Sequence, residues 1–153
     1  MRARDIMSSE PECVTRTDTV ERAARLMAEC DCGILPVVEA ADDKHIVGVV
    51  TDRDITVRGV ARGKGPDTNV GDVMTTSVSW LAADAGVDDI RRTMADRQIR
   101  RVVIVDDEQC CVGIVSQADL ARAASRRGDV DDTDLADVVE RISEPGGNAP
   151  SAD

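Results

Sequence analysis

The alternation of apolar and polar positions predicts five elements in the first 61 residues. Cys13–Thr15 is predicted to be a short extended stretch. Apolar residues then recur at the spacing of an amphipathic helix. We expect this helix to begin at the N-cap Asp18, with Glu21 completing a capping box, and to end at Gly33. Two strands and a second helix are predicted to follow, at 34–38, 46–51 and 52–61.

The same order of patterns returns in the second part of the chain. An extended stretch at 78–81 precedes a helix whose apolar stripe contains Val87, Ile90 and Met94. Strands at 101–105 and 111–116 follow, and then a helix from Gln117 to about Ser125. Each part therefore has the order β-α-β-β-α, which predicts a mixed α/β (α+β) fold.

Residue identities show that the two parts are copies. Gly48–Ile55 (GVVTDRDI) returns as Gly113–Leu120 (GIVSQADL), and the opening Ala3–Met7 (ARDIM) returns as Val70–Met74 (VGDVM). The openings are 67 residues apart and the closing motifs 65. Because a sheet of two or three strands is marginal alone, we expect two half-domains packed about a pseudo-twofold axis.

The repeat sets the expected domain boundaries. Repeat 1 with its glycine-rich linker covers residues 1–66, and repeat 2 covers residues 67–127. Residues 128–153 begin with an acidic connector. Apolar residues at helical spacing then predict a C-terminal amphipathic helix at 135–142, followed by a tail that we expect to be disordered.

Composition narrows the classes of function. The formal net charge is −11 and Phe and Tyr are absent, so we expect no nucleic-acid partner. The chain has no run of 18 apolar residues and no apolar signal core, so we expect a cytoplasmic protein that does not enter a membrane. With one histidine and no nucleophile–base arrangement, we expect the chain not to be an enzyme.

The five cysteines do not follow the spacing of a metal site. In a cytosolic chain reduced thiols are the expected state. Cys30 and Cys32 are separated by one residue rather than two, and the adjacent Cys110 and Cys111 point to opposite faces of a strand. His45 is the only histidine, and zinc ligands would have to come from distant segments, so no metal site is expected.

The repeated Gly-x-x-Thr/Ser-x-x-Asp motif has two interpretations. Thr51 with Asp54, and Ser116 with Asp119, are capping pairs at a strand-to-helix turn. The same turn offers free N–H groups and a positive dipole end to a phosphate, and its Asp can accept ribose hydroxyls. The glycine that opens each motif is expected to let its strand pass close to a neighbour.

The ordered double motif resembles the CBS-domain pair, also called a Bateman module. The segments that carry this resemblance include Ile34–Val38 (ILPVV), Gln98–Val105 (QIRRVVIV) and the two repeated motifs. The chain is similar to small stand-alone bacterial and archaeal members, including a hypoxia-response type. The resemblance implies a regulatory module that binds adenosine ligands, such as AMP, ADP, ATP, NAD or S-adenosylmethionine, in two clefts between the repeats. It implies no obligatory cofactor.

Carried over by position, the resemblance implies a set of ligand contacts. Arg53 would supply a cation beside the phosphate. Because Ala118 stands at its counterpart, unequal sites are expected, with the one holding Arg53 better suited to phosphate. Arg100 and Arg101 equally fit an exposed helix-to-strand corner. The implied contacts are Asp54 and Asp119 to ribose, Thr51 and Ser116 to phosphate, Gly33, Ile34, Arg100 and Arg101 at the base, and Val14, Thr15 and Val78 along the clefts.

A second hypothesis assigns the chain no nucleotide. Cys13, Cys30 and Cys32 all lie in repeat 1, and the helix that carries Cys30 could bring it toward Cys13. The chain would then be a redox-responsive or structural dimer. Under either hypothesis we expect a homodimer, with Trp80 as a core or interface anchor, and the resemblance also implies a protein partner that reads the ligand state.

Overall fold

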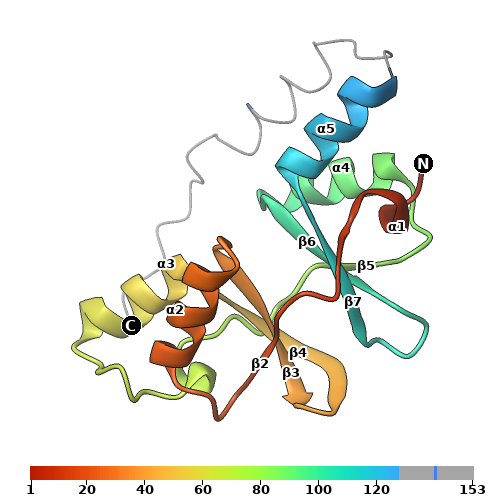
Figure 1. Ribbon diagram of the computed structural model, residues 1–153. Coiled ribbons are helices and arrows are strands. Elements are labelled where there is room, and N and C mark those ends of the chain that lie inside the picture. The colour runs from red at the N-terminus through yellow and green to blue at the C-terminus, as the bar shows by residue number, and fades with distance from the viewer. Residues whose placement is uncertain (128–139, 141–153) are drawn as a thin grey trace.

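The computed structural model describes residues 1–127 and Glu140 (Figure 1). The helix expected at 135–142 lies outside these residues except for Glu140, and the tail lies outside them entirely. Among the described residues, no helix is long and apolar enough to cross a membrane.

Repeat 1 forms a three-stranded sheet with one helix packed on it. The strand order is β2 (Val14–Thr15), β3 (Ile34–Ala40), β4 (Asp43–Thr51), with β2 parallel and β4 antiparallel to β3. Helix α2 (Val20–Glu29) buries Val20, Ala23 and Met27 against this sheet. The predicted β-α-β-β order is confirmed.

Repeat 2 has the same order of elements, on a four-stranded sheet. Strands β5 (Trp80–Ala82), β6 (Arg101–Val105) and β7 (Cys111–Ser116) repeat the arrangement of β2, β3 and β4. The fourth strand, β1 (Ser8–Ser9), pairs antiparallel with β7. Helices α4 (Val87–Arg97) and α5 (Gln117–Arg127) pack on this half of the molecule (Figure 1). The bounds predicted for β6 and β7 are confirmed.

The ends of α2 differ from the prediction. The N-cap is Thr19, whose hydroxyl accepts the N–H of Arg22 at 3.2 Å. Asp18 instead accepts the N–H of Thr15 at 2.8 Å and closes the turn before the helix. At the other end Asp31, and not Gly33, takes the left-handed conformation (φ 50°). The prediction of a capping box at Asp18 and the prediction that the helix ends at Gly33 are therefore both wrong.

The helical segment after Thr51 changes its winding along its length. It begins as α3 (Asp52–Asp54), continues as a π-helical turn, η1 (Ile55–Gly59), and ends as a 3₁₀ turn, η2 (Val60–Arg62). Gly63 follows with φ 72°. A run of three β-branched residues at 55–57 disfavours a regular α-helix here, so the predicted span is right but its regularity is not.

The opening segment of each repeat packs on the other repeat. Helix α1 (Ala3–Ile6) lies on repeat 2, where the N–H of Ala3 donates to the carbonyl of Ala85 at 2.9 Å and Ala3 is fully buried. The 3₁₀ turn η3 (Val70–Asp72) lies on repeat 1, where Val70 is buried in the core. Thr75 then bonds to the backbone of Val49 on β4. Each half-domain is therefore built from most of one repeat and the opening segment of the other repeat.

Gly48 and Gly113 allow this exchange. A Cβ atom at Gly48 would lie 2.7 Å from the carbonyl oxygen of Thr75 and would overlap Met74. A Cβ atom at Gly113 would lie 2.8 Å from Cγ of Met7. The exchanged segment passes directly over each strand, so a side chain does not fit. The expectation that these glycines permit a close approach is confirmed.

A third apolar cluster joins the two repeats. Val103, Val105 and Cys111 of repeat 2 pack against partly buried residues on the repeat 1 side, including Ile46 and Val49. Beside it the two β-hairpins touch, with the N–H of Ile46 donating to the carbonyl of Gln109 at 3.3 Å. The repeats therefore share a core as well as exchanging segments.

We expect Gly48→Ala to lower the free energy of unfolding by about 1–3 kcal/mol, because the new methyl group meets the backbone of Thr75. Urea denaturation followed by circular dichroism measures this. Gly59→Ala is the matched control, since its Cβ would lie 3.8 Å from Val73, an ordinary contact. Equal stability of the two variants would contradict the account of the exchange.

Candidate functional site

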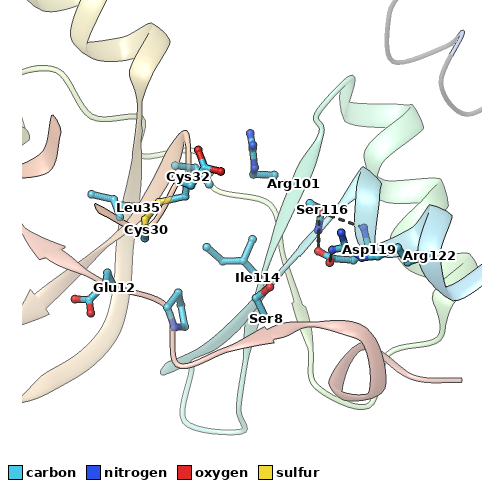
Figure 2. A pocket seen from close by; sticks show the side chains of 13 residues that line it. Ser8, Glu12, Cys30, Cys32, Leu35, Arg101, Ile114, Ser116, Asp119 and Arg122 are labelled. Carbon is cyan, nitrogen blue, oxygen red and sulfur yellow. Dashed lines mark hydrogen bonds and ion pairs between the residues drawn. A yellow bond between two sulfur atoms is a disulfide. The ribbon is translucent and has the colours of Figure 1, made fainter. Parts of the chain in front are cut away.

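Two cavities lie between the repeats, one beside each capping motif. The Asp119 cavity encloses about 290 Å³ (Figure 2). Ser116 and Asp119 lie on one side of it, and Glu12, Cys30 and Cys32 on the other. Its remaining lining residues are Ser8, Pro11, Asp31, Ile34, Leu35, Arg101, Ile114 and Arg122.

The Asp54 cavity is its counterpart and encloses about 250 Å³. Thr51 and Asp54 come from repeat 1, and Val78, Arg100 and Arg101 come from the second half of the chain. The other residues along its walls are Ile34, Val49, Thr75, Ser77, Ser79, Ile99 and Val103.

The two cavities use equivalent positions of the repeat. Ser8 and Thr75 are 67 residues apart, as are Pro11 and Val78, and each member lines its own cavity. Val78 was predicted from the sequence to line a cleft, but no such prediction was made for Pro11. The repeat itself carried the signal, because the offset of the openings applied to Val78 leads to Pro11.

Asp119 is held by its own capping turn. Its Oδ2 accepts the N–H of Ser116 at 2.7 Å and the Ser116 hydroxyl at 2.6 Å, while the N–H of Asp119 donates back to that hydroxyl at 3.2 Å. Its Oδ1 forms an ion pair with Arg122 (Figure 2). The carboxylate is buried, but it reaches the cavity wall.

Asp54 has a similar set of partners. It accepts the N–H of Thr51 at 3.1 Å, and the N–H of Asp54 donates to the Thr51 hydroxyl at 3.0 Å. The hydroxyl of Thr75, from the exchanged segment, lies 3.3 Å from both carboxylate oxygens. Arg58 Nε lies 3.9 Å from Oδ1. The capping interpretation is confirmed for both motifs, and both capping carboxylates also line cavities.

The charges around the two cavities differ. Arg100 and Arg101 line the Asp54 cavity, with Asp54 as its acidic residue. The Asp119 cavity shares Arg101, but Arg122 is already paired with Asp119 there, and Glu12 and Asp31 add two further carboxylates. The Asp54 cavity is therefore the more positive of the two.

Four of the residues predicted to contact ligand do not line either cavity. Val14 is buried in the core of repeat 1, and Thr15 bonds to Asp18. Gly33 lies under the side chain of Asp52, where a Cβ would come within 2.9 Å of Oδ2. Arg53 is exposed on the first turn of α3. Val14 points into the core and Thr15 is half-buried beside Asp18, and a periodicity argument could not distinguish these positions from a cavity wall.

The cysteines are not all free thiols. Cys30 and Cys32 form a disulfide at the C-terminal end of α2, which corrects the expectation of reduced thiols, and both line the Asp119 cavity. Cys13 is a free thiol and is not bonded to Cys30. It contacts Cys111 instead, and a hydrogen bond from the Cys111 thiol lowers the pKa of Cys13 while the pKa of Cys111 is raised.

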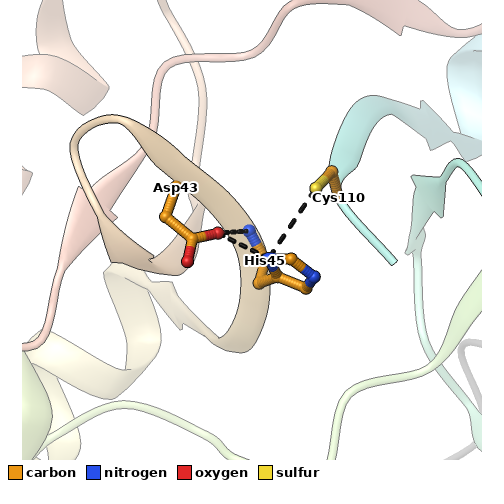
Figure 3. A group of neighbouring side chains, drawn as sticks. All are labelled: Asp43, His45 and Cys110. Atoms are coloured by element: carbon orange, nitrogen blue, oxygen red, sulfur yellow. Dashed lines mark hydrogen bonds and ion pairs between the residues drawn. The ribbon is translucent and has the colours of Figure 1, made fainter. Parts of the chain in front are cut away.

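A separate cluster of possible metal ligands lies outside both cavities. Asp43 and His45 lie at the start of β4, and Cys110 precedes β7 (Figure 3). No metal site was expected from the sequence, because no local pattern places residue 110 beside residue 45.

Comparison with known proteins identifies related chains. Residues 3–58 and 70–126 match the model of the CBS domain. Hypoxic response protein 1 of Mycobacterium tuberculosis is 38% identical over 121 residues, covering 78% of this chain and 82% of that protein. The crystal structure of Hypoxic Response Protein I with two coordinated zinc ions has a TM-score of 0.72 and 36% identity, covering 80% of this chain and 98% of that chain.

Two further solved structures contain adenosine ligands. CBSX2 in complex with AMP has a TM-score of 0.73 and 26% identity, and the match covers 83% of this chain and 98% of that one. The CBS-domain pair of MJ0100, in complex with 5′-methylthioadenosine and S-adenosyl-L-methionine, matches with the same TM-score, identity and coverage.

Proposed function

This chain belongs to the CBS-domain family, and on that premise we propose that it is a regulatory module. The module is proposed to bind adenosine-containing ligands in the Asp54 and Asp119 cavities. CBS domains are generally regulatory and non-catalytic. The observation that carries the proposal is the equivalence of the two cavities, each of which combines one capping carboxylate with residues of the other repeat. The adenosine ligands of CBSX2 and of the MJ0100 domain pair support this ligand class.

Each part of an adenosine ligand has a matching surface. The carboxylate of Asp54 or Asp119 accepts the ribose hydroxyls, which replace the Thr75 hydroxyl in one cavity and compete with Arg122 in the other. The resemblance placed Arg100 and Arg101 at the base, but as the cations on the wall of the Asp54 cavity they are proposed to contact phosphate instead. The base lies between aliphatic side chains, because the chain has no Phe or Tyr. The aliphatic residues available are Ile34, Leu35 and Ile114 in the Asp119 cavity, and Ile34, Val49, Val78, Ile99 and Val103 in the Asp54 cavity.

The two cavities are proposed to prefer different ligands. The Asp54 cavity, with Arg100 and Arg101, suits AMP, ADP or ATP. The Asp119 cavity, with Glu12 and Asp31, suits an adenosine ligand without phosphate, such as S-adenosylmethionine or methylthioadenosine. Unequal ligand preferences of the two sites were expected because Arg53 has Ala118 as its counterpart. Arg53 does not line the Asp54 cavity, so the proposed difference rests instead on the charged residues of the cavity walls.

The signal is proposed to be a change in the pose of the repeats. A ligand in either cavity contacts both repeats, so it favours the pose in which both walls reach it. Coupling of this kind is typically about 1–3 kcal/mol. Trp80 is 44% exposed and Val60 is 68% exposed, and these side chains are candidates for a homodimer contact or for a partner that reads the pose.

Calorimetry tests the proposal with AMP, ATP and S-adenosylmethionine on protein refolded free of carried-over ligand. We expect Asp54→Asn to weaken AMP and ATP about 10- to 100-fold, from the loss of charge-assisted hydrogen bonds worth about 1.5–3 kcal/mol. Asp119→Asn should weaken S-adenosylmethionine and leave AMP unchanged. Asp107→Asn, on an exposed turn, is the matched control. Failure of the native protein to bind any of the three ligands would refute the proposal.

A second candidate function, redox sensing, is favoured by the Cys30–Cys32 disulfide. Its two sulfur atoms belong to residues on the wall of the Asp119 cavity, opposite Ser116 and Asp119 (Figure 2). Reduction breaks the S–S bond, takes up two electrons and two protons, and leaves two thiols on that wall. The shape of the cavity would then depend on the redox state.

We expect a dithiol reductant to change the affinity of the Asp119 cavity for its ligand several-fold, while the Asp54 cavity keeps its affinity. Calorimetry before and after reduction measures both. The variant with Cys30→Ser and Cys32→Ser should lose the response, and Cys13→Ser should keep it. If reduction alters neither affinity, or if the double serine variant still responds, redox control through this disulfide is ruled out.

A further inference from the structure

Three side chains of the types that bind transition metals converge where the two β-hairpins meet (Figure 3). His45 Nδ1 lies 2.5 Å from Asp43 Oδ1 and 3.9 Å from Cys110 Sγ. The three atoms all lie within 4.8 Å of one another. Asp43 and His45 belong to repeat 1 and Cys110 to repeat 2, so the cluster spans the boundary between repeats.

The backbone on both sides holds these residues in place. His45 and Cys110 face each other as an isolated antiparallel bridge. Asp43 Oδ1 also accepts the N–H of His45 at 3.0 Å, which closes the first hairpin. In the second hairpin, Asp106 Oδ1 accepts the N–H groups of Glu108 at 3.0 Å and of Cys110 at 2.9 Å. The backbone positions of Asp43, His45 and Cys110 are therefore set before any ligand arrives.

We propose that Asp43, His45 and Cys110 bind one zinc ion, which ties the β3–β4 hairpin of repeat 1 to the β6–β7 hairpin of repeat 2. Thiolate, imidazole and carboxylate are the three ligand types that zinc takes in proteins. Calcium and magnesium prefer sets made of oxygen alone, which this cluster does not offer. A water molecule completes the tetrahedron, because both Asp43 and His45 are open to solvent, with side chains 43% and 53% exposed.

The present distances are close to those that zinc needs. Metal–ligand bonds of about 2.0–2.3 Å at tetrahedral angles place the ligand atoms about 3.3–3.6 Å apart. The Cys110–His45 separation of 3.9 Å must shorten slightly, and the His45–Asp43 separation of 2.5 Å must open. His45 is exposed and the other two side chains are half-buried, so small side-chain rotations are proposed to achieve both changes without moving the backbone.

The local charge also favours a cation. The carboxylates of Asp43, Asp106 and Glu108 lie close enough to His45 and Cys110 to act on both electrostatically. Their negative potential attracts a dication to this cluster.

Without metal, Asp43, His45 and Cys110 form a hydrogen-bonded cluster that holds one hairpin against the other.

A zinc titration distinguishes a metal site from a cluster held by hydrogen bonds alone. Protein stripped with a chelator and held in a metal-free phosphine reductant is titrated against a chromophoric zinc chelator. We expect one zinc per chain, with the affinity reduced at least tenfold in His45→Gln and in Cys110→Ser. Cys13→Ser, and the variant with both Cys30→Ser and Cys32→Ser, are the matched controls and should keep full affinity.

Cobalt(II) gives a second measurement on the same variants. Its thiolate charge-transfer band should appear in the native protein and in both controls, and disappear in Cys110→Ser. The proposal is overturned if the native protein binds no zinc, if His45→Gln and Cys110→Ser bind it as tightly as the native chain, or if the cobalt band survives in Cys110→Ser. Each of these results leaves the nucleotide proposal standing, because no zinc ligand lines the Asp54 or Asp119 cavity.

Discussion

The exchange of opening segments between the two repeats is the constraint on which the rest of the structure depends. Ala3 completes the core of repeat 2, and Val70, Val73 and Met74 complete the core of repeat 1. Each segment passes over a strand at a glycine, so neither half can close without the chain crossing to the other. A small sheet with one helix gains the buried surface it lacks in this way, and the two halves become one folding unit.

The exchange also builds the cavities. Thr75, on the segment that crosses to repeat 1, places its hydroxyl 3.3 Å from both oxygens of Asp54. Ser8, on the segment that crosses to repeat 2, lines the Asp119 cavity in the equivalent position. A carboxylate that caps a helix in one repeat therefore faces residues that the other part of the chain supplies. This arrangement lets one motif stabilise a helix and also present a carboxylate to a ligand.

Much of this was readable from the sequence. The repeat predicted the element order, the close approach at Gly48 and Gly113, and the positions of Asp54 and Asp119. Only the structure shows that Asp54 and Asp119 lie on cavity walls and that Val14 and Thr15 line neither cavity. Apolar periodicity predicts that Val14 is buried, but it does not predict which residues pack against its side chain. The crossing of Ala3–Ile6 and the meeting of His45 with Cys110 depend on contacts between distant segments, which no local pattern encodes. The Cys30–Cys32 disulfide is local, and it was missed because reduced thiols were expected.

A single ligand is proposed to contact both repeats at once. Hydrogen–deuterium exchange of the native protein, with and without saturating AMP, tests it most directly, because protection reports each segment separately. We expect AMP to slow exchange together in Thr51–Asp54 of repeat 1 and in 75–79 and 99–101 of the second half. Protection confined to one repeat, in a sample shown by calorimetry to be saturated with AMP, would contradict it.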